Sequence, residues 1–347
     1  METPVLFILF NRPDTTAAVF DAIRKAKPKK LYIAADGPRK GNIDDIVSCM
    51  QTRSVVEHID WDCKAERRFL DENAGCRMAV SSAITWFFDQ EEEGIILEDD
   101  CLPHPSFFPF CETLLAQYRD NHSIMHITGN NFQFGKKYGD ASYYFSTIAY
   151  IWGWASWRRA WEKYDVSLND FPTFLRHPKR SAFFLNKASE YYWLDAIYRV
   201  YTGASKNLII RTLNFIKQLI FPILLTNKVF MNRAFIGAHK NSTTWDFQWG
   251  YTIIKNHGIC IVPQVNLVSN IGFGNKAVHA VDKDSALANM PVQILGEIKH
   301  PPKIDIAIEA DMYSITAVFP RRTLSSLLTR KQIKSRISRF FGIDKRQ

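Results

Sequence analysis

Unbroken apolar runs alternate with amphipathic stretches along most of the chain. Residues 4–10 are apolar and end at Asn11-Arg12-Pro13, which is typical of a buried parallel strand followed by a turn. Similar short runs predict further strands, and stretches of helical periodicity between them predict helices. Strands are expected at 4–10, 30–35, 68–70, 94–97, 124–128 and 259–262, and helices at 14–27, 44–58, 73–88, 107–118, 183–200 and from 244 onward.

This alternation of strand and helix predicts an α/β fold with a mostly parallel sheet and helices on both faces. The pattern changes after Tyr143, where aromatic residues crowd 151–157. Residues 208–225 are strongly apolar but contain Arg211, Lys217 and Pro222. They are too interrupted for a membrane span, so a buried or an interfacial helix is expected there.

Bulk composition is that of an ordinary globular protein, with 46% hydrophobic and 23% charged residues. The net charge of +9 is unevenly placed, because residues 320–347 hold nine cations and one acid and so carry +8 of it. The rest of the chain is near neutral. Composition therefore gives no indication of a nucleic-acid-binding surface.

Six scattered cysteines form no CxxC pair and no zinc-type cluster with histidine. Such usage fits a reduced, cytoplasmic setting. The first twelve residues lack a basic segment and a small-residue cleavage site, and we interpret them as a first strand rather than a signal peptide.

Three consecutive carboxylates, Glu98, Asp99 and Asp100, follow the predicted strand at 94–97. In open α/β sheets, ligands bind at the carboxyl ends of the strands. Carboxylate oxygens suit a hard divalent cation, which can bridge to a diphosphate and offset the charge on a departing nucleoside diphosphate. A solvated acidic turn is the alternative. It is less favoured, because a buried strand rarely ends in three carboxylates without a counter-charge.

Other polar residues stand where they could join this site. Arg12 and Asp36 end the first two predicted strands, where a nucleotide base and ribose would lie. Arg77 opens a helix after Gly75, a position that suits a phosphate. Each also has a plainer interpretation, since Asp36-Gly37-Pro38 is a normal turn sequence and Arg77 could be a surface cation.

Two later segments add candidate chemistry. Asp246 lies among aromatic residues, which favours a general base, although a helix-capping aspartate is an equal alternative. Lys276 and His279 follow Gly272 and Gly274 in a loop that could close over a diphosphate or a metal. A lone histidine is more often structural.

Four longer stretches carry a resemblance to a known family: 94–103 (GIILEDDCLP), 126–132 (HITGNNF), 151–157 (IWGWASW) and 266–274 (NLVSNIGFG). Through them, residues 1 to about 290 resemble bacterial nucleotide-diphospho-sugar transferases. The order of motifs is more distantly similar to the N-acetylglucosaminyltransferases of N-glycan synthesis. The resemblance implies a GT-A-like fold, a manganese (or magnesium) cofactor, a UDP-sugar donor and an inverting reaction.

The resemblance also implies roles for single residues. Arg12 and Asp36 match uridine contacts, Glu98 and Asp99 match contacts to the donor sugar and ribose, and Asp100 matches the one direct protein ligand of the metal. Arg77 and Lys276 are further expected donor contacts, and His279 is a second expected metal ligand. Asp246 lies where a Trp-Asp-Asp-Trp element carries the base, but this chain has Trp-Asp-Phe-Gln-Trp there. Trp152, Trp154 and Trp245 are the expected acceptor contacts.

The expected function is transfer of a sugar from a UDP-sugar to a cell-surface glycan or a lipid-linked acceptor. A catalytically silent nucleotide-sugar-binding protein is the main alternative. A nucleotidyltransferase would show a glycine-rich basic loop after the first strand, and Asn11-Arg12-Pro13 is not one. The expected organisation is a transferase domain at 1–290 (nucleotide-binding segment 1–132, catalytic segment 143–290, helical insertion at about 182–241), an extension at 291–319 and a basic tail at 320–347.

The tail has apolar residues at three- and four-residue spacing with cations between them. This pattern predicts an amphipathic helix lying on an anionic membrane, which would place the protein on the inner face of the cytoplasmic membrane. A solvated tail, or a helix packed on the domain, is the alternative.

Overall fold

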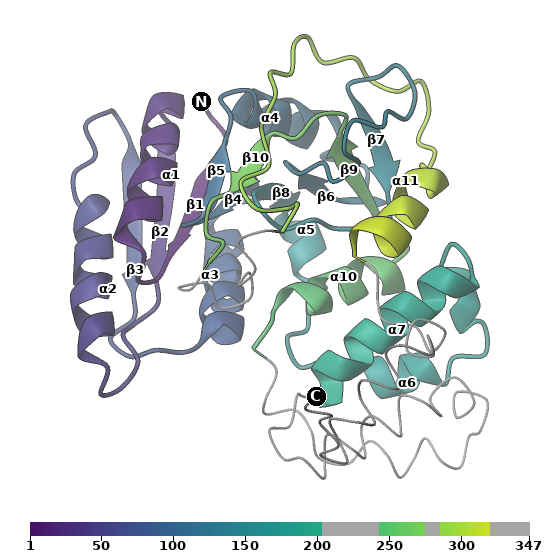
Figure 1. The fold of residues 1–347 in the computed structure, drawn as a ribbon, viewed down its shortest axis with the longest axis horizontal. Coiled ribbons are helices and arrows are strands. Elements are labelled where there is room, and N and C mark those ends of the chain that lie inside the picture. The colour runs from purple at the N-terminus through teal and green to yellow at the C-terminus, as the bar shows by residue number, and fades with distance from the viewer. Residues whose placement is uncertain (203–242, 275–284, 320–347) are drawn as a thin grey trace, which may run out of the picture.

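An eight-stranded sheet forms the centre of the protein (Figure 1), in a computed structural model that describes residues 1–202, 243–274 and 285–319. Its strand order is β3-β2-β1-β4-β8-β6-β9-β7. The strands are β1 (Val5–Leu9), β2 (Lys30–Ala35), β3 (Lys64–Phe69), β4 (Glu93–Glu98), β6 (Ile124–Thr128), β7 (Tyr143–Ser146), β8 (Trp154–Trp157) and β9 (Ile259–Pro263).

Six of these strands run in one direction. β1 pairs in parallel with β2 and β4, β2 with β3, and β6 with β9, whereas β8 is antiparallel to both β4 and β6, and β7 is antiparallel to β9. The predicted α/β class, with a mostly parallel sheet flanked by helices, is confirmed. A separate two-stranded ribbon joins β5 (Cys101–Pro103) to β10 (Val268–Asn270).

Helices cover both faces of the sheet because its strands are apolar on both sides. Val5, Phe7 and Leu9 of β1 share a core with α1 and α4, whereas Leu6 and Ile8 share a core with α3 and α10. A third core joins α6, α7, some residues of α10 and α11. The helices are α1 (Pro13–Ala26), α2 (Ile43–Val55), α3 (Cys76–Gln90), α4 (Phe107–Gln117), α5 (Arg158–Trp161), α6 (Phe171–Leu175), α7 (Lys187–Thr202), α10 (Asp246–Lys255) and α11 (Ile308–Tyr313), with a 3₁₀ turn at Arg180–Phe183 and a π-helical turn at Ser314–Val318.

The strands predicted at 30–35 and 124–128 have those bounds in the structure, and the helices fall within a few residues of prediction. The strand expected at 68–70 is longer, Lys64–Phe69, and the strands β5, β7, β8 and β10 were not predicted. The apolar segment 208–225, Lys276, His279 and the tail 320–347 lie outside the described residues. Among the residues that are described, no helix is long and apolar enough to cross a membrane.

A cluster of aromatic rings surrounds the fully buried His126 on the α10 side of the sheet. The ring of Trp154 stacks on the imidazole at 5.1 Å. The indole N–H of Trp249 donates to His126 Nδ1 (3.2 Å), and His126 Nε2 lies 2.9 Å from the carbonyl oxygen of Tyr150. Since an indole only donates and a carbonyl only accepts, His126 is neutral with its proton on Nε2. Burial lowers the pKa of His126 to about 4.

This depressed pKa makes stability depend on pH. Below the ordinary value near 6.5, the unfolded chain binds a proton at His126 that the folded chain does not. The contribution of His126 to stability is therefore complete above pH 6.5 and is lost as the pH falls toward 4. We expect His126→Gln to be less stable than the parent at pH 7.5, with a gap that narrows between pH 6.5 and 4.5 in urea unfolding. A gap independent of pH would contradict this assignment.

Candidate functional site

The carboxyl ends of β1, β2 and β4 lie next to one another at one edge of the sheet. Because these strands are parallel neighbours, the residues that follow them are brought together. Arg12 follows β1, Asp36 follows β2, and β4 ends on Glu98 with Asp99 and Asp100 directly after it. The structure brings these residues together at one edge of the sheet, as the sequence predicted.

Arg12 is the counter-charge of the acidic triplet. Its guanidinium donates from one terminal nitrogen to Asp99 Oδ1 (2.5 Å) and from the other to Asp100 Oδ2 (2.8 Å). The second oxygen of Asp99 accepts the backbone N–H of Phe10 at 3.1 Å. Burial opposes the charge on Arg12, but Asp99 and Asp100 outweigh it and raise the pKa of the guanidinium. One positive charge is therefore shared by two carboxylates, and Asp99, Asp100 and Arg12 together keep a net charge of −1.

Glu98 has no ion-pair partner within the described ranges and lies at the end of β4, partly exposed. Its desolvated position, together with the nearby charges of Asp100 and Asp99, raises the pKa of Glu98 to about 8. Burial also raises the pKa of Asp99, with Arg12 opposing the rise. The raised pKa values of Glu98 and Asp99 mean that these two carboxylates hold their negative charge reluctantly, so the site favours a ligand that brings positive charge or hydrogen-bond donors.

Asp36 is buried, and its carboxylate is already engaged by the protein. Oδ1 accepts the backbone N–H groups of Gly37 (2.9 Å) and Ala74 (2.8 Å), and Oδ2 accepts the side-chain amide of Asn73 (2.8 Å). Burial raises the pKa of Asp36, although backbone N–H groups oppose the rise. In this structure Asp36 holds the loop before α3 at the end of β2. Its predicted contact to a nucleotide base would have to use carboxylate oxygens that already accept these hydrogen bonds.

The first turns of α3 and α10 approach the triplet from the other side. Cys76 begins α3 and lies within electrostatic range of Glu98, Asp246, Asp36 and Arg12. Burial, followed by these carboxylates, raises the pKa of Cys76 to about 12. Arg77, the next residue, is half-buried. The structure therefore adds Cys76 to the predicted site residues. In the sequence, only its position next to Arg77 could have pointed to it.

Asp246 is the first residue of α10 and belongs to the same group. Its charge adds to the pKa rise of both Glu98 and Cys76, and it also acts on Tyr164. This position is compatible with a helix-capping aspartate, since Asp246 lies in the first turn of α10. It is equally compatible with a general base, since Asp246 lies near the acidic triplet. The fold thereby brings together two segments that lie far apart in the sequence.

The β5–β10 ribbon carries a cover over Asp100. Asn270 pairs with Cys101, and the next backbone N–H, that of Ile271, donates to the carbonyl oxygen of Asp100 (2.9 Å). Gly272 then lies so close to the ion pair that a Cβ there would overlap Asp100 Oδ2 and would be 2.5 Å from a guanidinium nitrogen of Arg12. The glycines of this segment had suggested a mobile lid. In the structure, position 272 needs a glycine because its backbone lies against the Arg12–Asp100 pair.

The three tryptophans expected at an acceptor differ in position. Trp154 has 0% and Trp245 3% of its surface exposed, and the two rings stack on each other in the core around His126. Neither ring is accessible to an acceptor in this structure. The expectation that Trp154 and Trp245 contact the acceptor is therefore corrected, because both are core residues. Trp152 is partly exposed and packs against Phe273, the residue after Gly272.

A divalent cation suits the chemistry of the triplet but would need ligands from elsewhere. Within the described ranges, no three His, Cys, Asp or Glu side chains are arranged to hold a metal ion. Asp100 is the more accessible of the two carboxylates paired with Arg12, with 15% of its side chain exposed against 3% for Asp99. Its hard oxygens fit manganese or magnesium as a single protein ligand, with diphosphate oxygens and water completing the shell.

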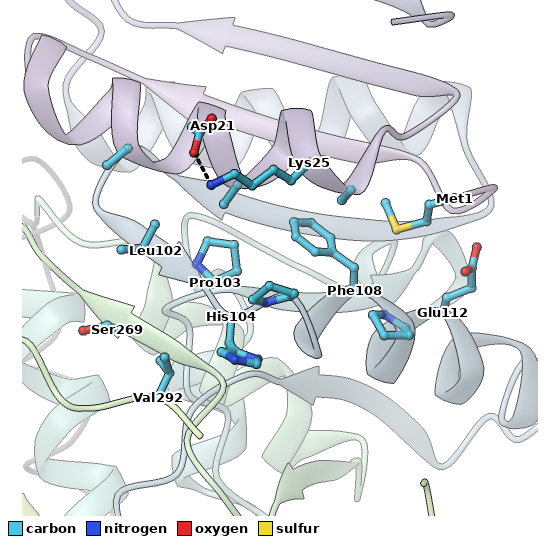
Figure 2. A pocket seen from close by; sticks show the side chains of 15 residues that line it. Met1, Asp21, Lys25, Leu102, Pro103, His104, Phe108, Glu112, Ser269 and Val292 are labelled. Carbon is cyan, nitrogen blue, oxygen red and sulfur yellow. Dashed lines mark ion pairs between the residues drawn. The ribbon is translucent and has the colours of Figure 1, made fainter. Parts of the chain in front are cut away.

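A groove of about 690 Å³ lies beside the β5–β10 ribbon (Figure 2). It is bordered by α1, the ribbon and the start of α4. Its charged groups and its histidine are engaged within the protein: Lys25 pairs with Asp21, His104 bonds Ser106, and Glu112 accepts from the first residues of the chain. The groove is not part of the carboxylate site.

Comparisons with known proteins find distant structural matches only. No known family matches the sequence, and no curated protein matches it. The galactosyltransferase LgtC, solved with donor and acceptor sugar analogues, aligns over 47% of this chain and 60% of its own, with 10% identity and a TM-score of 0.30. HddC from Yersinia pseudotuberculosis aligns over 47% and 80%, with 8% identity and a TM-score of 0.28.

UDP-glucose pyrophosphorylase complexed with UDP-glucose aligns over 38% of this chain and 64% of its own, with 13% identity and a TM-score of 0.22. This chain thus spans about 60% of the galactosyltransferase and 64% of the pyrophosphorylase. Matches this weak carry no weight for activity, and the fold class rests on the chain's own strand order.

The tight fit of Gly272 gives a direct test of the site. A methyl group at 272 would collide with the Arg12–Asp100 pair, and overpacking of this kind typically costs about 1–3 kcal/mol. We expect Gly272→Ala to lower the melting temperature by several degrees in calorimetry. Gly296→Ala is the matched control, because a Cβ at 296 meets nothing within 4 Å. Equal melting temperatures for the two variants would show that the cover does not lie on the ion pair.

Proposed function

We propose that this protein is a glycosyltransferase that moves a sugar from a UDP-sugar to a hydroxyl of a glycan or lipid-linked glycan acceptor, with a divalent cation as cofactor. The observation that carries the proposal is the acidic triplet Glu98–Asp100 at the carboxyl end of β4, paired with Arg12 and facing Asp246 from α10. A parallel-sheet edge with clustered acids and one arginine suits a nucleoside diphosphate bound through a metal.

The donor would be held by residues at the carboxyl ends of β1, β2 and β4 and by α3. Arg12 can exchange its bond to Asp100 for a donor phosphate, because a guanidinium binds phosphate in the same forked geometry as carboxylate. Arg77 would add a second cation, and Lys276 a third, although Lys276 lies outside the described residues. Asp36 would act chiefly by fixing the loop at 73–75. Glu98 and Asp99 would contact the sugar and ribose.

Asp100 would be the protein ligand of the cation, with His279 as a second proposed ligand outside the described residues. When bound, the cation would stabilise the negative charge that develops on the leaving nucleoside diphosphate. Asp246 would accept the proton of the attacking acceptor hydroxyl, since it lies beside the triplet among partly desolvated groups. Direct displacement with one base would invert the configuration at the anomeric carbon.

A catalytically silent nucleotide-sugar-binding protein is the second candidate. It shares the same binding residues, so UDP affinity does not separate the two candidates. Turnover does: release of UDP from UDP-sugars in the presence of an acceptor mixture supports the transferase, and tight binding without release supports the silent protein.

The donor site is tested by calorimetry with UDP, with and without manganese. We expect UDP to bind only weakly without the metal, and Asp100→Asn to remove the gain that manganese gives, because the variant loses the charged ligand. Asp140→Asn changes an exposed aspartate of the same charge and serves as the control. Equal UDP affinity with and without manganese would refute the metal site at Asp100.

The base is tested by turnover. Removing a general base typically costs about 10²–10⁴ in rate. We expect Asp246→Asn to lose that much turnover while its UDP affinity stays within about twofold of the parent's. NMR of the product should show inversion at the transferred sugar. Retention of configuration would exclude the single displacement, and normal turnover in the variant would exclude Asp246 as the base.

A further inference from the structure

Two partly exposed aromatic rings pack on each other where the chain leaves the covered ion pair. Phe273 follows Gly272, whose backbone abuts Asp100 and Arg12. Its ring meets that of Trp152 edge to face, with centroids 5.6 Å apart and planes at 89°. Trp152 is supported from another direction by the buried Phe132 at 5.3 Å. The site thus has an aromatic corner, made by Trp152 and Phe273.

The corner depends on the buried side chain of Asn130, which connects the two segments that carry the rings. Asn130 Oδ1 accepts the backbone N–H of Trp152 (3.1 Å), and its Nδ2 donates to the carbonyl oxygen of Val268 in β10 (3.1 Å). Val268 lies five residues before Phe273. A single amide therefore links the Trp152 segment to the strand that leads to the cover of Asp100.

Neighbouring contacts leave this junction little freedom. Gly129 N–H donates to the carbonyl of Gly153 (2.8 Å), and Leu267 N–H donates to the carbonyl of Gly129 (2.8 Å). The side chain of Val268 fills the space where a Cβ of either glycine would lie. Since three segments meet here through bonded backbone, the aromatic corner is a preformed feature rather than an accidental pair of rings.

We propose that Trp152 and Phe273 form a sugar-stacking subsite, and that Asn130 is the positioning residue that sets its geometry. The ligand is the pyranose ring that receives the transferred sugar, whose apolar C–H face suits an aromatic ring, while its hydroxyls remain available to polar groups. The inference rests on the proposed glycosyltransferase function. It adds to that function the way in which the acceptor sugar would be held, by stacking of its pyranose ring, and two residues, Phe273 and Asn130.

The test uses the full-length chain with UDP and manganese, and saturation-transfer NMR to a mixture of methyl β-glycosides of glucose, galactose and N-acetylglucosamine. Irradiating aromatic protons of the parent should saturate ring C–H protons of at least one glycoside. Trp152→Leu and Phe273→Leu should each weaken that transfer about fivefold, because each removes one aromatic contact. UDP affinity, measured on the same samples by calorimetry, should remain within about twofold.

Asn131 provides the matched control for Asn130. It is also buried, but its backbone N–H donates to Asn266 and its side-chain amide donates to Pro263, rather than to the Trp152 and Val268 partners of Asn130. Asn130→Ala should lose saturation transfer as Trp152→Leu does, whereas Asn131→Ala should keep it at a comparable loss of melting temperature. A merely structural role predicts that the two variants behave alike, and that result would overturn the assignment of Asn130.

Two further outcomes are separable. If the parent binds UDP with manganese but transfers no saturation to any glycoside, or if the Trp152 and Phe273 variants transfer as the parent does, the subsite is refuted while the proposed donor site stands. If the parent binds no UDP, the proposed function itself fails.

Discussion

The site depends on one ion pair network, in which Arg12 bridges Asp99 and Asp100. Three consecutive carboxylates at a partly desolvated sheet edge would repel one another, and an unpaired charge left there is costly, on the order of several kcal/mol. The guanidinium allows β4 to end in acids and still be buried along its length. The cover at 271–272 then rests on the pair, because a glycine is the only residue whose backbone can come so close.

From this pair the other elements of the site take their places. The ribbon of β5 and β10 begins directly after Asp100 and returns the chain to it at Ile271. The loop before α3 is fastened by Asp36, and the start of α10 faces Glu98. Each contact joins segments far apart in the sequence. Together these polar contacts surround the three acids at the edge of the sheet.

Much of the fold was readable because buried parallel strands are continuous apolar runs, as at 30–35 and 124–128. The acids at the end of β4 were found for the same reason. Trp154–Trp157 was not recognised as a strand, since its aromatic residues also fit a sugar-binding surface, and only the fold shows that Trp154 and Trp245 face the core. The partners of Asp36 and Asn130 could not be predicted, because they depend on hydrogen bonds across 37 and 138 residues.

Cys76 gives the site an unexpected chemical character. Oxidants and alkylating reagents attack the thiolate, and a pKa near 12 leaves almost none of it at neutral pH. Burial and, after it, the same carboxylates that prepare this edge for a cation therefore keep this sulfur atom unreactive. A cysteine with so little thiolate reacts slowly with oxidants and with covalent inhibitors, and a cation bound beside the carboxylates would weaken only the part of this protection that comes from their charge.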